Sequence, residues 1–323
     1  MGIKNLNRFL RTECKESIKI TPLVELSGKK IVIDISIYLF KYAAENCLIE
    51  NIYLMLSVFR HYNIIPVFVF DGKTPTEKKE LVQRRREDKL EAEKEYQLLQ
   101  NKLDSQTELD ETDNQEIHNN MDLLKKKFIY ISKADFENVK KLITAFGATY
   151  YDAPGEADEL CAMLTIKGKV WACVSEDMDM FVYGCTRVIR YLSLLNHTTV
   201  LYEQKGLLSN LGITQKELSE ICILSGTDYN LNENSKNKVS LHNTLKLFKK
   251  YKKHKQDCDF YTWLMKNTNY IEDYELLMKI NSMFNINESK NLKVFEKLKI
   301  VNGQINMNEI KEILKQDGFI FPK

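Results

Sequence analysis

The chain has 323 residues, with 47 Lys and Arg against 45 Asp and Glu, and a formal net charge of only +2. Its hydrophobic content of 44% excludes wholesale disorder, and its length allows one large domain or two modest ones. A total charge so close to zero does not indicate a nucleic-acid partner, so only the distribution of charge along the chain can do so.

Three short apolar runs predict buried strands, at residues 31–33, 67–70 and 170–174. Helical patterns lie between and after them, at residues 36–62, 76–100, 135–146, 156–167, 214–225 and 239–251. Strands that alternate with helices predict a layered α/β fold with a parallel sheet. The polar, acidic stretch 101–122 has no periodicity and predicts a mobile insertion.

Basic side chains gather in two of the predicted helices. Residues 78–89 contain Lys78, Lys79, Arg84, Arg85, Arg86 and Lys89, and residues 246–255 contain six lysines and His254. Either run can be a solvated helix face or a surface that grips a phosphate backbone.

The seven cysteines are scattered and include no CxxC pair, which argues against a disulfide framework and against a zinc site. No apolar run reaches the roughly 18–20 residues that a membrane span needs. We therefore expect a soluble, intracellular protein with no membrane partner.

Each predicted strand ends in acidic residues. Asp34 follows the first run, Asp71 the second, and Asp177 and Asp179 come just after the third. The carboxyl ends of parallel strands share one edge of a sheet, which is where ligands bind in open α/β folds, so these side chains should converge. Three further acids can join them: Glu156 and Asp158 at the start of a predicted helix, and Asp228 after an apolar run.

Converging carboxylates repel one another unless cations lie between them. Oxygen ligands of this kind suit Mg²⁺ or Mn²⁺ and do not suit zinc. Two such ions activate a water and stabilise the leaving oxygen in phosphodiester hydrolysis. A single Asp after a strand is more often a helix N-cap, so the prediction rests on the whole set.

Several motifs resemble those of flap endonucleases and their XPG-type relatives, in the family's order over roughly residues 1–250. They are Met1–Leu6, Val32–Asp34, Val67–Lys73, Asp152–Asp158, Ser175–Asp179 and Leu224–Tyr229. The resemblance implies a PIN-like nuclease domain over 1–255: an N-region 1–100, an arch with the acidic insertion at about 76–132, and an internal region 135–230. A helix–two-turn–helix-like DNA-binding element would occupy about 214–255, and a helical C-terminal extension would follow at 256–323.

The same resemblance assigns the site. Asp34, Asp71, Glu156 and Asp158 would surround one Mg²⁺, and Asp177, Asp179 and Asp228 a second, with Mn²⁺ as a substitute. Asp158 stands where the family usually has Glu, so its contact can pass through water. Lys78 and Arg85, two helical turns apart, would reach the scissile phosphate.

Other residues would contact DNA. The set is Gly2, Tyr38, Phe40, Arg84, Arg86, Lys236, Lys238, Lys246 and Lys249, where Tyr38 and Phe40 are alternative candidates for stacking on a base. An aromatic residue at this place is more often part of the core.

Two departures limit what the resemblance implies. Residues 230–239 contain no glycine where the family has a Gly-x-Gly hairpin. In the family the backbone of that hairpin binds K⁺, so the resemblance does not support K⁺ binding here. The segment between Asp34 and Asp71 is short, which weakens the expectation of a flap preference, and the C-terminus lacks a sliding-clamp motif.

We therefore expect a monomeric, two-metal 5′ nuclease acting on DNA with a 5′ flap or a free 5′ end, in the nucleus or another replication compartment. Three alternatives stay open. They are a 5′-3′ exonuclease or junction- or bubble-cutting relative, a DNA-binding relative without catalysis, and a phosphohydrolase with Asp34 as nucleophile. The last would want a second Asp where Ser36 stands.

Overall fold

The computed structural model describes residues 3–105, 120–121, 123–230, 239–253, 258–286 and 290–319. Gly2, Lys236, Lys238 and most of the acidic insertion therefore lie outside the described residues. No helix in the described ranges is long and apolar enough to cross a membrane.

A seven-stranded sheet forms the centre of the molecule, in the order β1-β7-β6-β5-β2-β3-β4. Strands β6, β5, β2, β3 and β4 are parallel, and β7 and β1 are antiparallel to their neighbours. The bounds are β1 (Ile18–Pro22), β2 (Lys30–Asp34), β3 (Ile65–Phe70), β4 (Thr149–Asp152), β5 (Ala172–Val174), β6 (Arg187–Ser193) and β7 (Thr198–Glu203). The predicted α/β class is thus confirmed.

The three predicted strands are β2, β3 and β5, whose side chains are almost all buried. The other four were missed because polar residues interrupt them. In β6, for example, Arg190 is only 6% exposed because its guanidinium donates to the Glu176 carbonyl at 2.9 Å and pairs with the Glu176 carboxylate at 3.3 Å. Such a tertiary partner is invisible to a pattern of apolar residues.

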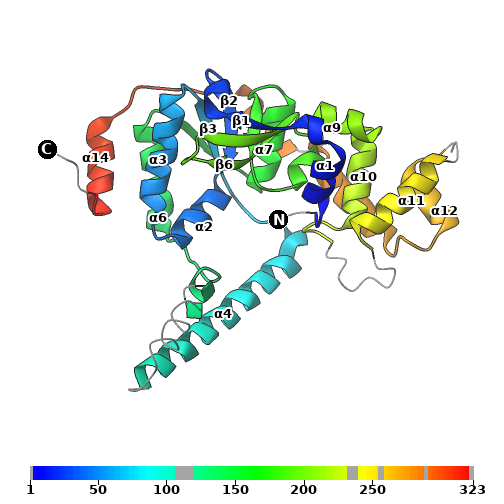
Figure 1. Cartoon of the computed structure of the whole chain (residues 1–323), viewed down its shortest axis with the longest axis horizontal. Helices are drawn as coiled ribbons and strands as arrows, with labels where there is room; N and C mark the ends of the chain where they lie inside the picture. Colours follow the sequence, from blue (N-terminus) through cyan, green and yellow to red (C-terminus); the bar gives the residue numbers. More distant parts are fainter. Residues whose placement is uncertain are drawn as a thin grey trace.

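Helices cover both faces of the sheet (Figure 1). The side chains of successive strand residues point to opposite faces and pack in two separate cores. Val32 packs on the side of α1 (Leu6–Glu13), α7 (Ala157–Ile166), α8 (Asp179–Tyr183), α9 (Gln204–Leu211) and α10 (Gln215–Ser225). Ile31 and Ile33 pack on the side of α2 (Ser36–Ala44), α3 (Leu48–His61), α6 (Lys133–Ala145) and α14 (Met307–Gln316). This alternation is the two-residue period of a strand buried on both faces.

The helix predicted over residues 36–62 is two helices. It breaks between α2 and α3, where Asn46 adopts a left-handed backbone conformation with φ 53°. Asn tolerates that region better than most residues, and the break turns the chain back along the sheet.

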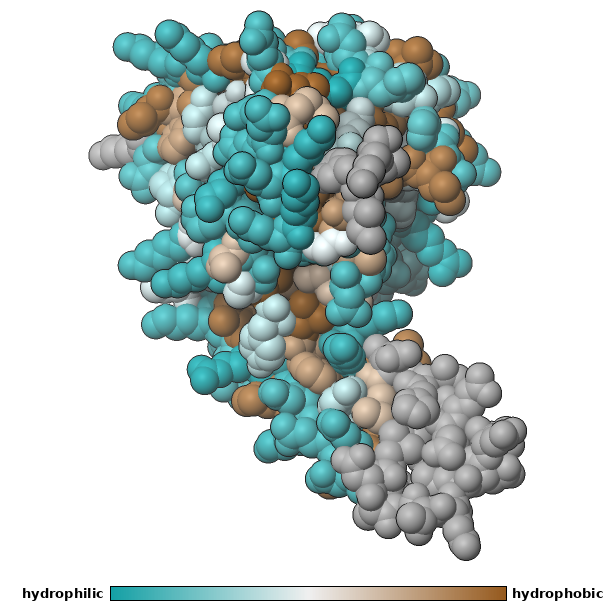
Figure 2. All heavy atoms as spheres, turned by 90° about the vertical axis from the view of Figure 1, so that its left-hand side faces the viewer, coloured by the Kyte–Doolittle hydropathy of each residue, from teal (hydrophilic) through white to brown (hydrophobic). Residues whose placement is uncertain are grey.

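Helix α4 (Lys79–Ser105) projects away from the sheet as a long arm (Figure 1). Its surface in Figure 2 is mostly hydrophilic, as expected for a helix with little of its length against the core. The arm begins directly after the short helix η3 (Thr76–Lys78), at the edge of the sheet where β2 and β3 end.

The C-terminal part of the chain returns to the sheet. Helices α11 (Leu241–Lys253), α12 (Phe260–Asn267) and α13 (Tyr274–Met283) lie beside α10, and η6 (Lys290–Lys297) follows. Residues 299–306 then run beside β4, where the Gly303 amide donates to the Gly147 carbonyl at 2.7 Å. Helix α14 ends this return by packing on α6.

Candidate active site

Acidic residues converge at the carboxyl edge of the parallel strands. Asp34 is the last residue of β2, Asp71 follows β3, and Asp177 lies just beyond β5. Strand β2 is hydrogen-bonded to β3 on one side and to β5 on the other. The chain therefore adds β3 and β4 on one side of β2 and later adds β5 and β6 on the opposite side. This is the topological switch point of the sheet, the place where open α/β folds bind ligands.

Short polar contacts fix Asp34 and Asp177 in the buried part of the site. Each is 6% exposed. Asp34 accepts from the Ser36 amide at 3.2 Å and from the Ser175 hydroxyl at 3.4 Å. The Ser175 hydroxyl also accepts from the Asp177 amide at 3.1 Å, and Asp177 in turn accepts from the Asp179 amide at 2.9 Å. The two strand ends are therefore tied through one serine.

Asp71 connects β3 to the start of α7. Its carboxylate accepts from the Ala157 amide at 2.8 Å and from the Ser36 hydroxyl at 2.5 Å. The next residue, Gly72, donates its amide to the Gly155 carbonyl at 2.8 Å, and a Cβ there would lie 1.9 Å from the Ala153 carbonyl oxygen. Only glycine permits this close approach, which holds Asp71 next to the loop that carries Glu156.

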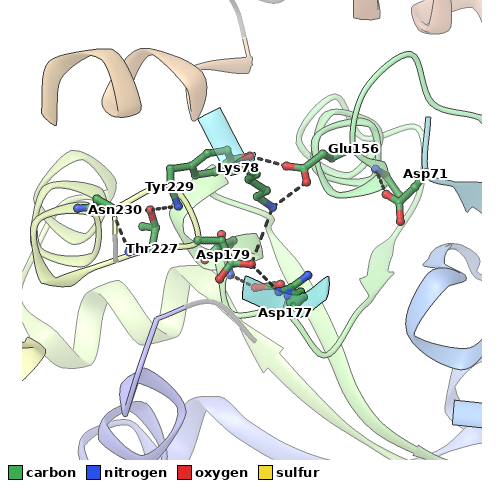
Figure 3. Close-up of polar contacts among 11 residues, drawn as sticks. Asp71, Lys78, Glu156, Asp177, Asp179, Thr227, Tyr229 and Asn230 are labelled. Atoms are coloured by element: carbon green, nitrogen blue, oxygen red, sulfur yellow. Dashed lines mark hydrogen bonds and ion pairs between the residues drawn. The ribbon is translucent and has the colours of Figure 1, made fainter. Parts of the chain in front are cut away.

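Lys78 lies among the acids. Its ammonium is 2.7 Å from the Glu156 carboxylate (Figure 3). It is also 3.9 Å from the carboxylate of Asp228, and only 10% of the Lys78 side chain is exposed. Arg85, about two helical turns further along the chain in α4, pairs with the same Asp228 at 3.2 Å. The expected spacing of these two cations thus brings both to one carboxylate.

Tyr229 completes this group, although sequence reasoning gave it no role. Its hydroxyl donates to Glu156, and the Lys78 ammonium lies 4.8 Å from the centre of its ring. The residue belongs to the Leu224–Tyr229 motif and directly follows Asp228, which was the available signal.

Burial and mutual repulsion perturb the acids. Burial, followed by the charge of Asp71, raises the pKa of Asp34 to about 7. Burial and then neighbouring carboxylates raise the pKa of Asp158 and of Asp179 well above the usual value. Burial lowers the pKa of Lys78, but Glu156, Asp158 and Asp228 outweigh it and the net shift is upward. The cluster therefore favours bound positive charge.

The donor set fits hard divalent cations. All seven candidates are carboxylates, and Asp158 and Asp179 each keep one buried carboxylate oxygen without a hydrogen-bond partner. A buried acceptor left in this way is costly unless a cation or donor satisfies it. Within the described ranges, no three His, Cys, Asp or Glu side chains are grouped closely enough to hold one ion, and the Lys78 ammonium pairs with two of the seven acids, Glu156 and Asp228.

The predicted DNA contacts are placed differently from one another. Tyr38 is only 3% exposed and packs in the core, whereas Phe40 is 46% exposed, so Phe40 alone of the two can stack on a base. Residues two positions apart lie on different sides of a helix, so only one of these two side chains can face the core, and it is that of Tyr38. Arg84 and Arg86 lie on the exposed surface of α4, and Lys246 and Lys249 on that of α11, where they line one cleft.

Two family models match the chain. The XPG N-terminal domain matches residues 1–92, and the XPG I-region matches residues 147–228. Flap endonuclease 1 from Anoplopoma fimbria is 30% identical over 247 residues, which cover 71% of this chain and 62% of the relative. The same enzyme from Glossina morsitans morsitans is 28% identical, with 71% and 61% covered. The chain thus spans about three fifths of the length of these relatives.

Solved structures share the fold. The catalytic core of Rad2 in complex with DNA substrate has a TM-score of 0.66 at 18% identity, over 98% of this chain and 96% of that one. Human GEN1 in complex with Holliday junction DNA has a TM-score of 0.64 at 18% identity, over 98% and 73%. Flap endonuclease-1 from Methanococcus jannaschii has 0.56 at 20%, over 93% and 96%. Because the two matched models describe successive regions of one family and together span more than half of the sequence, the chain belongs to the XPG family.

Proposed function

We propose that this protein is a Mg²⁺-dependent nuclease that hydrolyses DNA where a 5′ single strand leaves a duplex. The observation that carries the proposal is the meeting of carboxylates from β2, β3, α7, α8 and the loop after α10 with Lys78 and Arg85 at the foot of the α4 arm. A phosphodiester needs both groups: acids to hold cations, and fixed cations to bind its own negative charge.

Two groups of acids would hold the ions. Asp34, Asp71, Glu156 and Asp158 would serve one, and Asp177, Asp179 and Asp228 the other, with the unpartnered oxygens of Asp158 and Asp179 among the ligands. When bound, such ions supply an activated water and stabilise the leaving oxygen. The ammonium of Lys78 now shares Glu156 and Asp228, so it would turn toward the substrate phosphate as the acids take up cations.

The other side chains would position the strand. Lys78 and Arg85 would bind the scissile phosphate and offset the charge that develops on it. Phe40, exposed on α2 near the same edge, would stack on the adjacent base, while Arg84 and Arg86 would hold the strand along the arm. Lys246 and Lys249 on α11 would contact the duplex backbone.

We further propose that the protein acts as a monomer in the compartment where DNA is replicated or repaired. The relatives named flap endonuclease 1 favour a flap substrate, whereas the GEN1 structure was solved with Holliday junction DNA. Junction cleavage is therefore the second candidate, and it uses the same acids.

The test is cleavage of labelled DNA by the full chain in Mg²⁺. The substrates are a 5′ flap, a nicked duplex, a blunt duplex, a single strand and a four-way junction, and Asp177→Asn is the matched variant. We expect incision at the base of the flap that EDTA or Asp177→Asn abolishes. A ladder of short products would place the enzyme among exonucleases, and incision of the four-way junction alone would favour the second candidate. DNA binding without cleavage would refute the proposal.

A further inference from the structure

A second cleft lies at the opposite end of the sheet, where the parallel strands begin. Its lining includes Lys30, the first residue of β2, and Arg187, the first residue of β6, and its volume is about 1000 Å³. Lys30 and Asp34 are the two ends of the five-residue strand β2, roughly 13 Å apart along it. The cleft is thus on the edge of the sheet away from the acids.

The cleft is strongly basic although the whole chain is nearly neutral. Among its lining residues five are cationic and one is acidic: Lys29, Lys30, Lys169, Lys205 and Arg187 against Glu203. Glu203 lies 3.7 Å from the Arg187 guanidinium and offsets part of this charge. The excess of positive charge inside a concave surface concentrates anions there.

Trp171 holds two of these cations in place. The Lys29 ammonium is 5.6 Å from the centre of its ring, and the Arg187 guanidinium is 4.9 Å from it. Cation–π contacts of this kind fix long side chains that would otherwise lose entropy on binding a ligand. Because both cations are already held beside one ring, they can bind an anion that has several oxygens at a smaller entropy cost.

One lining residue calls for a hydrogen-bond donor. Gln204 is 5% exposed, and its amide nitrogen donates to the Phe181 carbonyl at 3.1 Å and to the Gln215 side chain at 2.6 Å. Its side-chain oxygen is buried without a partner. If the Gln204 side chain turned toward the cleft, a ligand that brings an N–H or O–H group as well as a negative charge would satisfy this oxygen.

We infer that this cleft binds a phosphate ester of a nucleotide, either as a free nucleotide or as part of a nucleic-acid strand. A phosphate supplies the oxygens for Lys29 and Arg187, and a sugar or base supplies the donor for Gln204. The inference does not depend on the proposed nuclease reaction, because none of these residues belongs to the acidic site.

Trp171 provides the assay. The chain has two tryptophans, and the other, Trp263, is buried in α12, so Trp263→Phe leaves Trp171 as the reporter. The full-length variant is titrated in EDTA, which prevents metal-dependent cleavage, with thymidine 5′-monophosphate and separately with a short single-stranded oligothymidylate. Lys29→Ala and Arg187→Ala are then added to this background. Lys19→Ala, on the exposed surface of β1, removes the same charge outside the cleft.

We expect a saturable change in Trp171 emission, and an affinity that falls about tenfold with Lys29→Ala or Arg187→Ala but not with Lys19→Ala. Saturation by both probes assigns a nucleotide site, and saturation by the oligonucleotide alone assigns a strand-binding site. With the oligonucleotide, each lost contact should also reduce the salt dependence, by a slope of about 0.7. Unchanged emission with both probes, or equal affinity of all variants, would overturn the inference.

Discussion

Lys78→Met removes the ammonium from the acidic cluster while keeping most of the aliphatic stem. The Lys78–Glu156 pair spans 2.7 Å, and its side chains are only 10% and 16% exposed, so solvent screens it little. Removing one partner of a buried pair leaves an uncompensated charge and costs about 3–5 kcal/mol. We expect a loss of that size in the free energy of unfolding, measured by urea denaturation in EDTA.

The same substitution has a second expected result. In excess Mg²⁺ the stability deficit should shrink, because bound cations relieve the repulsion among the acids, whereas cleavage should slow by about 10²–10³-fold. Lys79→Met is the matched control, since Lys79 is the exposed next residue, and it should change stability by less than about 0.5 kcal/mol. A Lys78→Met loss below about 1 kcal/mol in EDTA would refute the buried ion pair.

Three further predictions concern other residues. Burial raises the pKa of Glu220 to about 7, although the charge of Lys216 opposes the shift. The folded protein therefore binds this proton more tightly than the unfolded chain does, and the free energy of unfolding falls as pH rises from about 4.5 through 7. Glu220→Gln should therefore stabilise the protein by about 3 kcal/mol at about pH 8 and have little effect at about pH 4, by thermal or urea unfolding. Gly72→Ala should cost roughly 1–3 kcal/mol or more, because its Cβ meets the Ala153 carbonyl. Phe40→Ala should slow cleavage by about 1–3 kcal/mol in activation free energy and leave the unfolding midpoint unchanged.

Each has an outcome that contradicts it. Parallel pH profiles for Glu220→Gln and the parent would show that Glu220 titrates normally. Native stability of Gly72→Ala would mean that the loop at Ala153 moves away freely. An unchanged single-turnover rate for Phe40→Ala would remove the stacking role.

The convergence of the acids could be predicted because it depends only on strand direction. Asp34 and Asp71 each end a continuous apolar run, and parallel runs place their ends together. The location of Lys78 could not be predicted in the same way. Its ammonium reaches Glu156 and Asp228, which are far from it in sequence, and only the folded structure brings the three together.

The choice between Tyr38 and Phe40 shows a similar limit. Both are aromatic residues of one short, mostly apolar helix, so hydrophobicity alone does not say which one faces the core. The sheet and α3 decide it by covering one side of α2, where Tyr38 lies. The basic cleft at Trp171 was also missed, because Lys29, Lys169 and Arg187 are far apart in sequence and form no run.

The return of residues 299–319 to the sheet affects how the protein is made. Ile310 and Leu314 of α14 are fully buried in the core that also contains Ile31 and Phe68, which are synthesised more than 240 residues earlier. During translation, that core stays incomplete until α14 has left the ribosome, and its apolar surface is exposed to chaperones meanwhile. Contacts between such distant segments also slow folding. A stop codon shortly before α14 should therefore yield an aggregation-prone chain, even though every residue proposed for catalysis would be present.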